Sequence, residues 1–203
     1  MTPIYHITHV DNLPGIIRDG KLWSDAQRRK RKIPCTNIGY SHIKDRRLTR
    51  KVPVAVKGML GDYVPFNFCS RSVMLYVIWR GHDDYQGGQK TIVHLVSSVE
   101  AAMETGRPWA FTDRHADLAY ANFFDDWQHQ DEVDWEVMRL RQWGGNDDQK
   151  ERRQAEFLVH DWFPWAAIER IGVIDILMAD KVRQIVAEAT HVPRVCVQRG
   201  WYY

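Results

Sequence analysis

The sequence lacks the features that mark several large classes of protein. Its longest apolar runs fall far short of the roughly twenty residues that a membrane-spanning helix needs. Its three cysteines stand far apart and form no C-x-x-C pair, which argues against a disulfide framework or a zinc knuckle. The N-terminal stretch MTPIYHITHVDNL has no basic start followed by an apolar run. We therefore expect no secretory signal and a cytoplasmic protein.

Motifs of the common nucleotide-binding, metalloprotease and hydrolase families are also missing. The chain contains no G-x-x-x-x-G-K-[ST], no G-x-G-x-x-G after a strand, no H-E-x-x-H and no G-x-S-x-G. Among nine histidines, the only close pair is His6 and His9, which would point to opposite faces of a strand. We therefore expect no metal site and no prosthetic group.

Charge is unevenly distributed, although the net charge is only +2. Residues 28–57 contain eleven Lys or Arg residues against one acid, Asp45, whereas residues 113–136 contain eight acids against Arg114. A one-sided basic segment is typical of proteins that bind phosphates, either in a nucleotide or in a nucleic acid. A solvated surface loop is the alternative interpretation of the same pattern.

The length of 203 residues fits a single domain, residues 1–203. Short strands and short helices without regular β-α alternation predict an α+β fold. We expect a flexible loop over residues 24–37 and interpret the apolar run VMLYVIW at 73–79 as a strand. The patterns predict helices over residues 10–22, 38–48, 97–106 and 179–190, and strands over 4–8, 52–56, 64–68, 91–96, 109–113, 194–198, within 168–179 and from 156 onward.

Glu156 occupies an unusual place in the stretch RRQAEFLVHDWFPW. It precedes an apolar strand, where an unpaired charge would be costly to bury. Such a glutamate must sit at an edge, pair with a cation or face a cleft. A structural ion pair is the commoner of these roles, and the residue alone does not decide between them.

Five blocks of the sequence, in this order, resemble the DarT family of toxins that transfer ADP-ribose to DNA. The similarity runs from about residue 3 to about residue 200 and is strongest to the thymidine-modifying branch. The blocks are IYHITHVDNLPGIIRDGKL at 4–22, IGYSHIKDRR at 38–47, DYVPFNFCSRSVMLY at 62–76, TDRHA at 112–116 and QAEFLV at 154–159.

The resemblance implies an ADP-ribosyltransferase fold, in which a split and twisted pair of β-sheets carries short helices. It implies NAD⁺ as a substrate and the N3 atom of thymine in single-stranded DNA as the acceptor, within a preferred sequence context. It also implies a toxin whose partner is a DarG-type macrodomain antitoxin. Two alternatives remain: an ADP-ribosyltransferase with another acceptor (guanine in DNA, RNA or protein), and a non-catalytic nucleic-acid-binding domain.

The resemblance also assigns roles to individual residues. Glu156 becomes the catalytic glutamate and Arg47 its partner arginine, although a shift of one residue in the match would exchange Arg47 for Arg46. His115 lies at the start of the substrate-recognition element that ends at Glu156. The residues that match the family's NAD⁺ contacts are His6, Ile7, Thr8, Gly15 and Trp23.

The chemistry of the reaction suits these residue types. Breaking the bond between nicotinamide and ribose creates a cation-like sugar, which a carboxylate such as Glu156 stabilises. The N3 atom of thymine becomes a good nucleophile only when its proton leaves, and a cation stabilises the resulting anion. Arg47 can therefore stabilise the thymine anion or bind the phosphates of NAD⁺, and the sequence does not separate these roles.

Further residues are candidates for binding from their position and type alone. If their segment lines the cleft, Met74 and Tyr76 pack against the nicotinamide or the target base. A strand of DNA needs a cationic groove for its phosphates. The candidates for contacting the DNA are Arg46, Arg71, His115, Lys150, Arg152 and Arg153.

Overall fold

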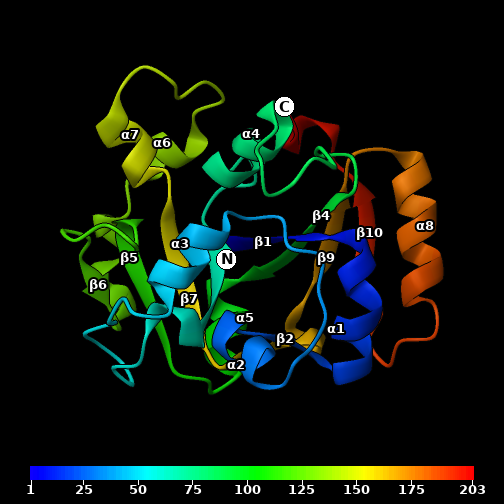
Figure 1. Ribbon diagram of the computed structural model, residues 1–203, viewed down its shortest axis with the longest axis horizontal. Helices are drawn as coiled ribbons and strands as arrows, with labels where there is room; N and C mark the ends of the chain where they lie inside the picture. The colour runs from blue at the N-terminus through cyan, green and yellow to red at the C-terminus, as the bar shows by residue number, and fades with distance from the viewer.

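A mixed eight-stranded sheet forms the centre of the molecule in the computed structural model, which describes residues 1–203 (Figure 1). Its strand order is β10-β9-β4-β1-β3-β7-β5-β6, and a separate two-stranded ribbon joins β2 to β8. The strands are β1 (Pro3–His9), β2 (Lys21–Trp23), β3 (Tyr63–Asn67), β4 (Ile92–Ser98), β5 (Trp109–His115), β6 (Phe123–Phe124), β7 (Ala155–His160), β8 (Trp162–Pro164), β9 (Arg170–Val173) and β10 (Arg194–Val197).

The large sheet is split in the middle, between β1 and β3. These two strands are in register at a single pair, Tyr5 and Asn67. By contrast, β1 pairs with β4 from Pro3 to His9, and β3 pairs with β7 along its whole length. The sheet therefore consists of two halves that diverge from one junction, and the predicted α+β fold with split sheets is confirmed.

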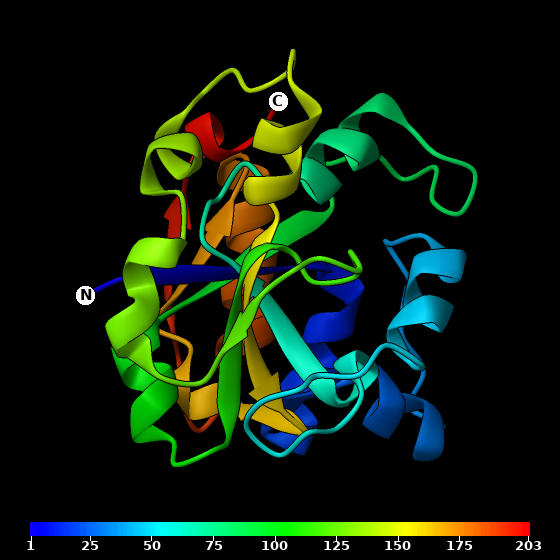
Figure 2. The same ribbon diagram turned by 90° about the vertical axis from the view of Figure 1, so that its left-hand side faces the viewer.

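Eight short helices lie around the sheet (Figures 1 and 2). In Figure 1, α8 lies at the right beside β9 and β10, whereas α6 and α7 lie at the upper left. None of the helices is long and apolar enough to cross a membrane. The helices are α1 (Leu13–Asp19), α2 (Asp25–Lys30), α3 (Ser41–Arg47), α4 (Val73–Arg80), α5 (Val99–Glu104), α6 (Trp135–Arg139), α7 (Asp147–Arg152) and α8 (Ile176–Val186).

Local sequence signals explain several helix ends. Gly20 ends α1 in the left-handed conformation, with φ of 66°, which glycine adopts without steric cost. Ser98 caps α5, because its hydroxyl accepts a hydrogen bond from the backbone N–H of Ala101. Asp175 caps α8 in the same way through Met178. The helices predicted over residues 10–22, 38–48 and 97–106 are therefore present, although shorter than predicted.

Buried aromatic and branched side chains hold the two halves of the sheet together. The largest apolar cluster includes Phe66 of β3, Phe157 of β7 and Phe163 of β8, all fully buried. The rings of Phe66 and Phe163 meet edge to face, with their centroids 4.7 Å apart. A second cluster includes Leu75 and Ile78 of α4. The core therefore fixes the positions of β3, β7 and α4 relative to one another.

Four segments differ from the prediction. Residues 73–79 form a helix, α4, not a strand, because Ser72 caps it through Leu75 and because a helix buried on several sides is as uniformly apolar as a buried strand. Residues 52–56 form a loop. The segment 24–37, predicted to be a loop, contains α2. The strand predicted within 168–179 ends at Val173, two residues before Asp175, which caps α8.

Candidate active site

A cavity of about 300 Å³ lies where the two halves of the sheet diverge. His6, Ile7 and Thr8 of β1 line one part of it, and Pro65 and Asn67 of β3 line another. Residues of α1, β2, α2, α3, α4, β5 and β7, and of the loop between α2 and α3, also line it. The cavity therefore draws on segments far apart in the chain, from His6 to Glu156, as expected for a binding site formed by the fold as a whole.

Arg47 and Glu156 form a two-pronged ion pair in the wall of this cavity. Nη1 of Arg47 lies 2.9 Å from Oε1 of Glu156, and Nη2 lies 2.9 Å from Oε2. Both residues are more than nine-tenths buried. Two parallel hydrogen bonds between a guanidinium and a carboxylate fix both side chains in one orientation. The carboxylate of Glu156 and the guanidinium of Arg47 are therefore held side by side, in one orientation, in the wall of the cavity.

The position of Glu156 is fixed by the sheet. Glu156 is in register with Asn67 of β3, which in turn is in register with Tyr5 of β1, so Glu156 lies at the junction where the sheet splits. On its other side the register of β5 and β7 shifts between Phe111 and His115. Within this irregularity the backbone N–H of Glu156 donates to Oγ1 of Thr112 at 3.0 Å. Such irregularities commonly aim a side chain at a functional site.

The charge state of Arg47 follows from the pair. Burial lowers the pKa of Arg47, but the charge and hydrogen bonds of Glu156, together with the charges of Asp25 and Asp117, outweigh this effect, so the pKa lies above its ordinary value. The guanidinium therefore stays protonated at any physiological pH. Arg47 can stabilise a negative charge in the cavity but cannot serve as a proton acceptor.

Histidines occupy two further positions in the wall. His6 donates from Nδ1 to the carbonyl oxygen of Pro65 at 2.8 Å, which leaves Nε2 as an acceptor. Burial lowers the pKa of His6 and also that of His115, which lies at the end of β5. Both rings are therefore neutral at pH 7. Neutral imidazoles that line a cavity can accept hydrogen bonds from hydroxyl or N–H groups of a ligand.

Most of the residues that the sequence associates with NAD⁺ lie together in the structure. One residue of that group, Tyr76, does not line the cavity. Its ring packs against Trp143 and Tyr203, with centroids 5.3 and 5.2 Å away, because residues 73–80 are helical and Tyr76 lies on a different face of α4 from Met74. The other members of this group line the cavity: His6, Ile7, Thr8, Gly15, Trp23, Arg47 and Met74.

Of the residues predicted to contact DNA, only His115 lines the cavity. Arg153 was predicted to face a groove, and this is wrong: its side chain is 1% exposed and donates to the carbonyl oxygens of Val137 and Arg71. Arg153 instead ties the start of β7 to neighbouring segments. Arg152 is bound by Asp134 and Asp148, which offset its charge.

The remaining three members of this group lie outside the cavity. Arg46 pairs with Asp117 at 2.6 Å and leaves 58% of its side chain exposed. The guanidinium of Arg71 lies over the ring of Tyr203, 4.2 Å from its centroid. Lys150 is exposed on α7. Arg47, not Arg46, is therefore the arginine that meets Glu156.

Sequence reasoning missed other charged residues of the cavity. Asp25 and Arg28 of α2 and Lys44 of α3 all line it, within and beside the segment that was predicted to be a loop. The helical spacing between Lys44 and Arg47 was the available signal, because residues three positions apart lie on one face of a helix. Asn67 also lines the cavity and gave no sequence signal of its own.

Comparisons with known proteins identify the family of the chain. A model of the family described as "ssDNA thymidine ADP-ribosyltransferase, DarT" matches residues 5–203. A DNA ADP-ribosyl transferase from Thermus sp. (strain 2.9) is 46% identical over 204 residues, which covers 100% of this chain and 96% of the relative.

Two solved structures of the Thermus sp. 2.9 protein are similar to the whole chain. The structure in complex with ADP-ribosylated ssDNA has a TM-score of 0.94 at 47% identity and covers 100% of this chain and 96% of the other. The structure in complex with NAD⁺ has a TM-score of 0.89 at 44% identity and covers 100% and 98%. The chain therefore belongs to the DarT family of ssDNA thymidine ADP-ribosyltransferases.

Proposed function

We propose that this chain, by its family an NAD⁺-dependent DNA ADP-ribosyltransferase, transfers ADP-ribose from NAD⁺ to the N3 atom of thymine in single-stranded DNA. The observation that carries the proposal is the buried pair of Arg47 and Glu156 in the wall of the cavity. A carboxylate and a protonated arginine, held side by side, suit a reaction that develops a positive sugar next to a negative nucleophile.

On the donor side, Glu156 is proposed as the catalytic carboxylate. The bond between C1′ of the ribose and the nicotinamide nitrogen breaks, and nicotinamide leaves with the bonding electrons as a neutral molecule. The ribose passes through a state with positive charge at C1′ and at the ring oxygen, which the carboxylate stabilises. Glu156 is well placed for this because the sheet and Arg47 hold it rigidly while the cavity leaves it open to a ligand.

On the acceptor side, Arg47 is proposed to stabilise the thymine as its N3 proton leaves. The N3 atom then forms the new bond to C1′, and the released proton passes to solvent. Arg47 stays protonated, so it offers a fixed positive charge without taking up the proton itself. His115 lines the cavity as a neutral ring, and we propose that its ring N–H donates a hydrogen bond to a carbonyl oxygen of the target base.

The DNA strand on either side of the target base is proposed to cross the surface that carries Arg46, Arg71 and Lys150. These residues lie outside the cavity, where contacts to phosphates supply affinity without reading the sequence. Arg152 lies between two carboxylates and contributes less positive charge to this surface. We further propose that the reaction prefers a short sequence context around the thymine.

The biological setting is proposed from the family. We propose that the protein is the toxin of a toxin-antitoxin pair, that its partner is a DarG-type macrodomain protein which removes the modification, and that it acts in the cytoplasm. We also propose that residues 1–203 form a single catalytic domain. The unbroken strand order across the large sheet, which mixes early and late segments of the chain, supports this.

Labelled NAD⁺ tests the proposed function directly. We expect label to enter single-stranded oligonucleotides that contain thymine and to be absent from oligonucleotides of equal length without it. Label on thymine-free DNA, on RNA or on protein would favour a transferase with another acceptor. If no label appears on any acceptor while the protein still binds DNA, a non-catalytic nucleic-acid-binding domain is the better interpretation.

A further inference from the structure

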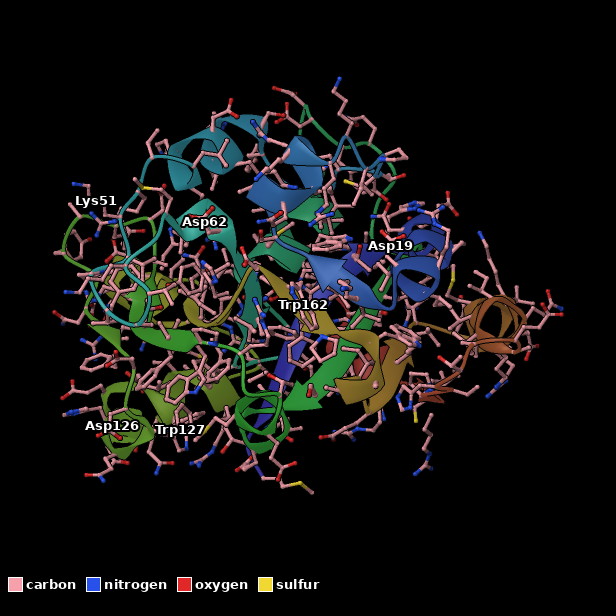
Figure 3. All side chains as sticks on the ribbon, turned by 90° about the horizontal axis from the view of Figure 1, so that it is seen from below. Asp19, Lys51, Asp62, Asp126, Trp127 and Trp162 are labelled. Atoms are coloured by element: carbon pink, nitrogen blue, oxygen red, sulfur yellow. The ribbon has the colours of Figure 1, made fainter.

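Four Lys or Arg side chains line the cavity, and they differ in the groups that they contact in the free protein. Arg47 is held by Glu156 through two nitrogens. Lys21 of β2 lies over two indole rings, 4.9 Å from the centroid of Trp23 and 4.4 Å from that of Trp162, which Figure 3 labels. The other two, Arg28 and Lys44, are engaged only by Asp25, which also lines the cavity.

Arg28 and Lys44 meet at a single oxygen atom. Nη2 of Arg28 lies 3.2 Å from Oδ1 of Asp25, and Nζ of Lys44 lies 3.3 Å from the same oxygen. Two cations that converge on one point form a site for an oxyanion, and a phosphate oxygen suits the same donors as a carboxylate oxygen. In the free protein, the carboxylate of Asp25 fills this site.

Asp25 is ionised at neutral pH. Burial raises the pKa of its carboxyl group, but Lys44 and Arg28 lower it by more, so the pKa lies below its ordinary value. A second anion that binds beside Asp25 is therefore attracted by Arg28 and Lys44 and repelled by the carboxylate of Asp25.

NAD⁺ carries such an anion, a diphosphate with two negative charges. We infer that Asp25 is an internal competitor of this diphosphate: Arg28 and Lys44 pair with Asp25 in the free protein and with the diphosphate of NAD⁺ in the complex. This inference rests on the proposed function, because it takes NAD⁺ as the ligand of the cavity. Asp25 then weakens the binding of the donor and keeps the two cations in place while the cavity is empty.

A second ion pair keeps the helices together during such an exchange. α2 and α3 lie side by side at one edge of the molecule (Figure 2), and Arg29 of α2 lies 2.9 Å from Asp45 of α3. This pair faces solvent, with 42% of Arg29 and 65% of Asp45 exposed, and neither residue lines the cavity. It offers a matched control, since its loss removes a link between the same helices without changing the charge of the cavity.

Calorimetric titration with ADP and with adenosine tests the inference without any need for turnover. We expect Asp25→Asn to bind ADP about threefold to tenfold more tightly than the wild type, because one repulsive charge is removed. Adenosine, which has no phosphate, should bind the variant and the wild type equally. Arg28→Gln should bind ADP more weakly, and the control Asp45→Asn should bind it as the wild type does. Asp25→Ala repeats the test if the asparagine variant is poorly folded.

The outcomes separate this inference from the proposed function. If Asp25→Asn and Asp25→Ala bind ADP as weakly as the wild type or more weakly, Asp25 orients the two cations and does not compete, and the inference is wrong. Tighter binding of adenosine as well would show a general change in the cavity and would also overturn it. If the wild type binds neither ADP nor NAD⁺, NAD⁺ is not the donor, and the proposed function fails together with the inference.

Discussion

Replacement of Glu156 by glutamine should reduce ADP-ribosyl transfer to a thymine-containing oligonucleotide by about 100- to 1,000-fold. The amide keeps the shape of the side chain and one oxygen acceptor for Arg47, but it carries no negative charge to stabilise the ribose cation. The measurement is the rate of a single turnover with saturating NAD⁺ and DNA, and DNA binding by the variant should stay close to that of the wild type.

The folding stability of variants at position 156, compared with their activity, separates a catalytic glutamate from a structural one. Glu156 is buried and makes two hydrogen bonds with Arg47, so its removal as Glu156→Ala leaves a buried cation unpaired and should cost about 3–5 kcal/mol of folding free energy. Glutamine should cost less, because one hydrogen bond remains. A Glu156→Gln variant that unfolds at lower urea concentration than the wild type and yet keeps full activity while folded would show that the carboxylate is structural.

Replacement of Arg47 and of Arg46 by alanine should have very different effects, although the two residues are adjacent. Arg47→Ala should reduce single-turnover transfer by about 100-fold or more, because it removes the fixed positive charge beside the acceptor and frees the carboxylate of Glu156. Arg46→Ala should change the rate less than about threefold, because the side chain of Arg46 is 58% exposed and pairs with Asp117, not with Glu156.

Arg47→Lys refines this comparison. Lysine keeps the positive charge but cannot form two parallel hydrogen bonds with a carboxylate, so the orientation of Glu156 is lost while the charge remains. Its activity should fall between those of the wild type and Arg47→Ala. Equal loss of activity in Arg46→Ala and Arg47→Ala, at equal stability, would contradict the assignment of Arg47 as the partner of Glu156.

Local sequence patterns predicted much of the sheet, and the clearest signal was the run of buried branched residues in TIVHLV. The segments 91–96, 109–113 and 194–198 all form strands, and Glu156 stands at the start of β7, inside the first residues of the strand predicted there. Helix α4 was misread because seven consecutive apolar or aromatic residues from Val73 fit a buried helix and a buried strand equally well. The cap at Ser72 was the signal that could have decided between them.

The site itself depends on contacts that no local pattern contains. Arg47 and Glu156 are 109 positions apart in the sequence, and only the resemblance to a family joined them before the structure did. The burial of Arg153 could not be read from the sequence either, because a charge beside two others is usually exposed. Its two carbonyl acceptors come from the turn before α4 and from α6.

The most direct test of thymine N3 as the acceptor uses two DNA strands that differ by one methyl group. Both strands contain a single thymine, and in one of them the N3 atom is methylated and cannot form a new bond to ribose. After incubation with NAD⁺, the intact mass of each strand is measured. We predict that the unmethylated strand gains one ADP-ribosyl group and that the methylated strand gains none. Modification of both strands would contradict transfer to N3.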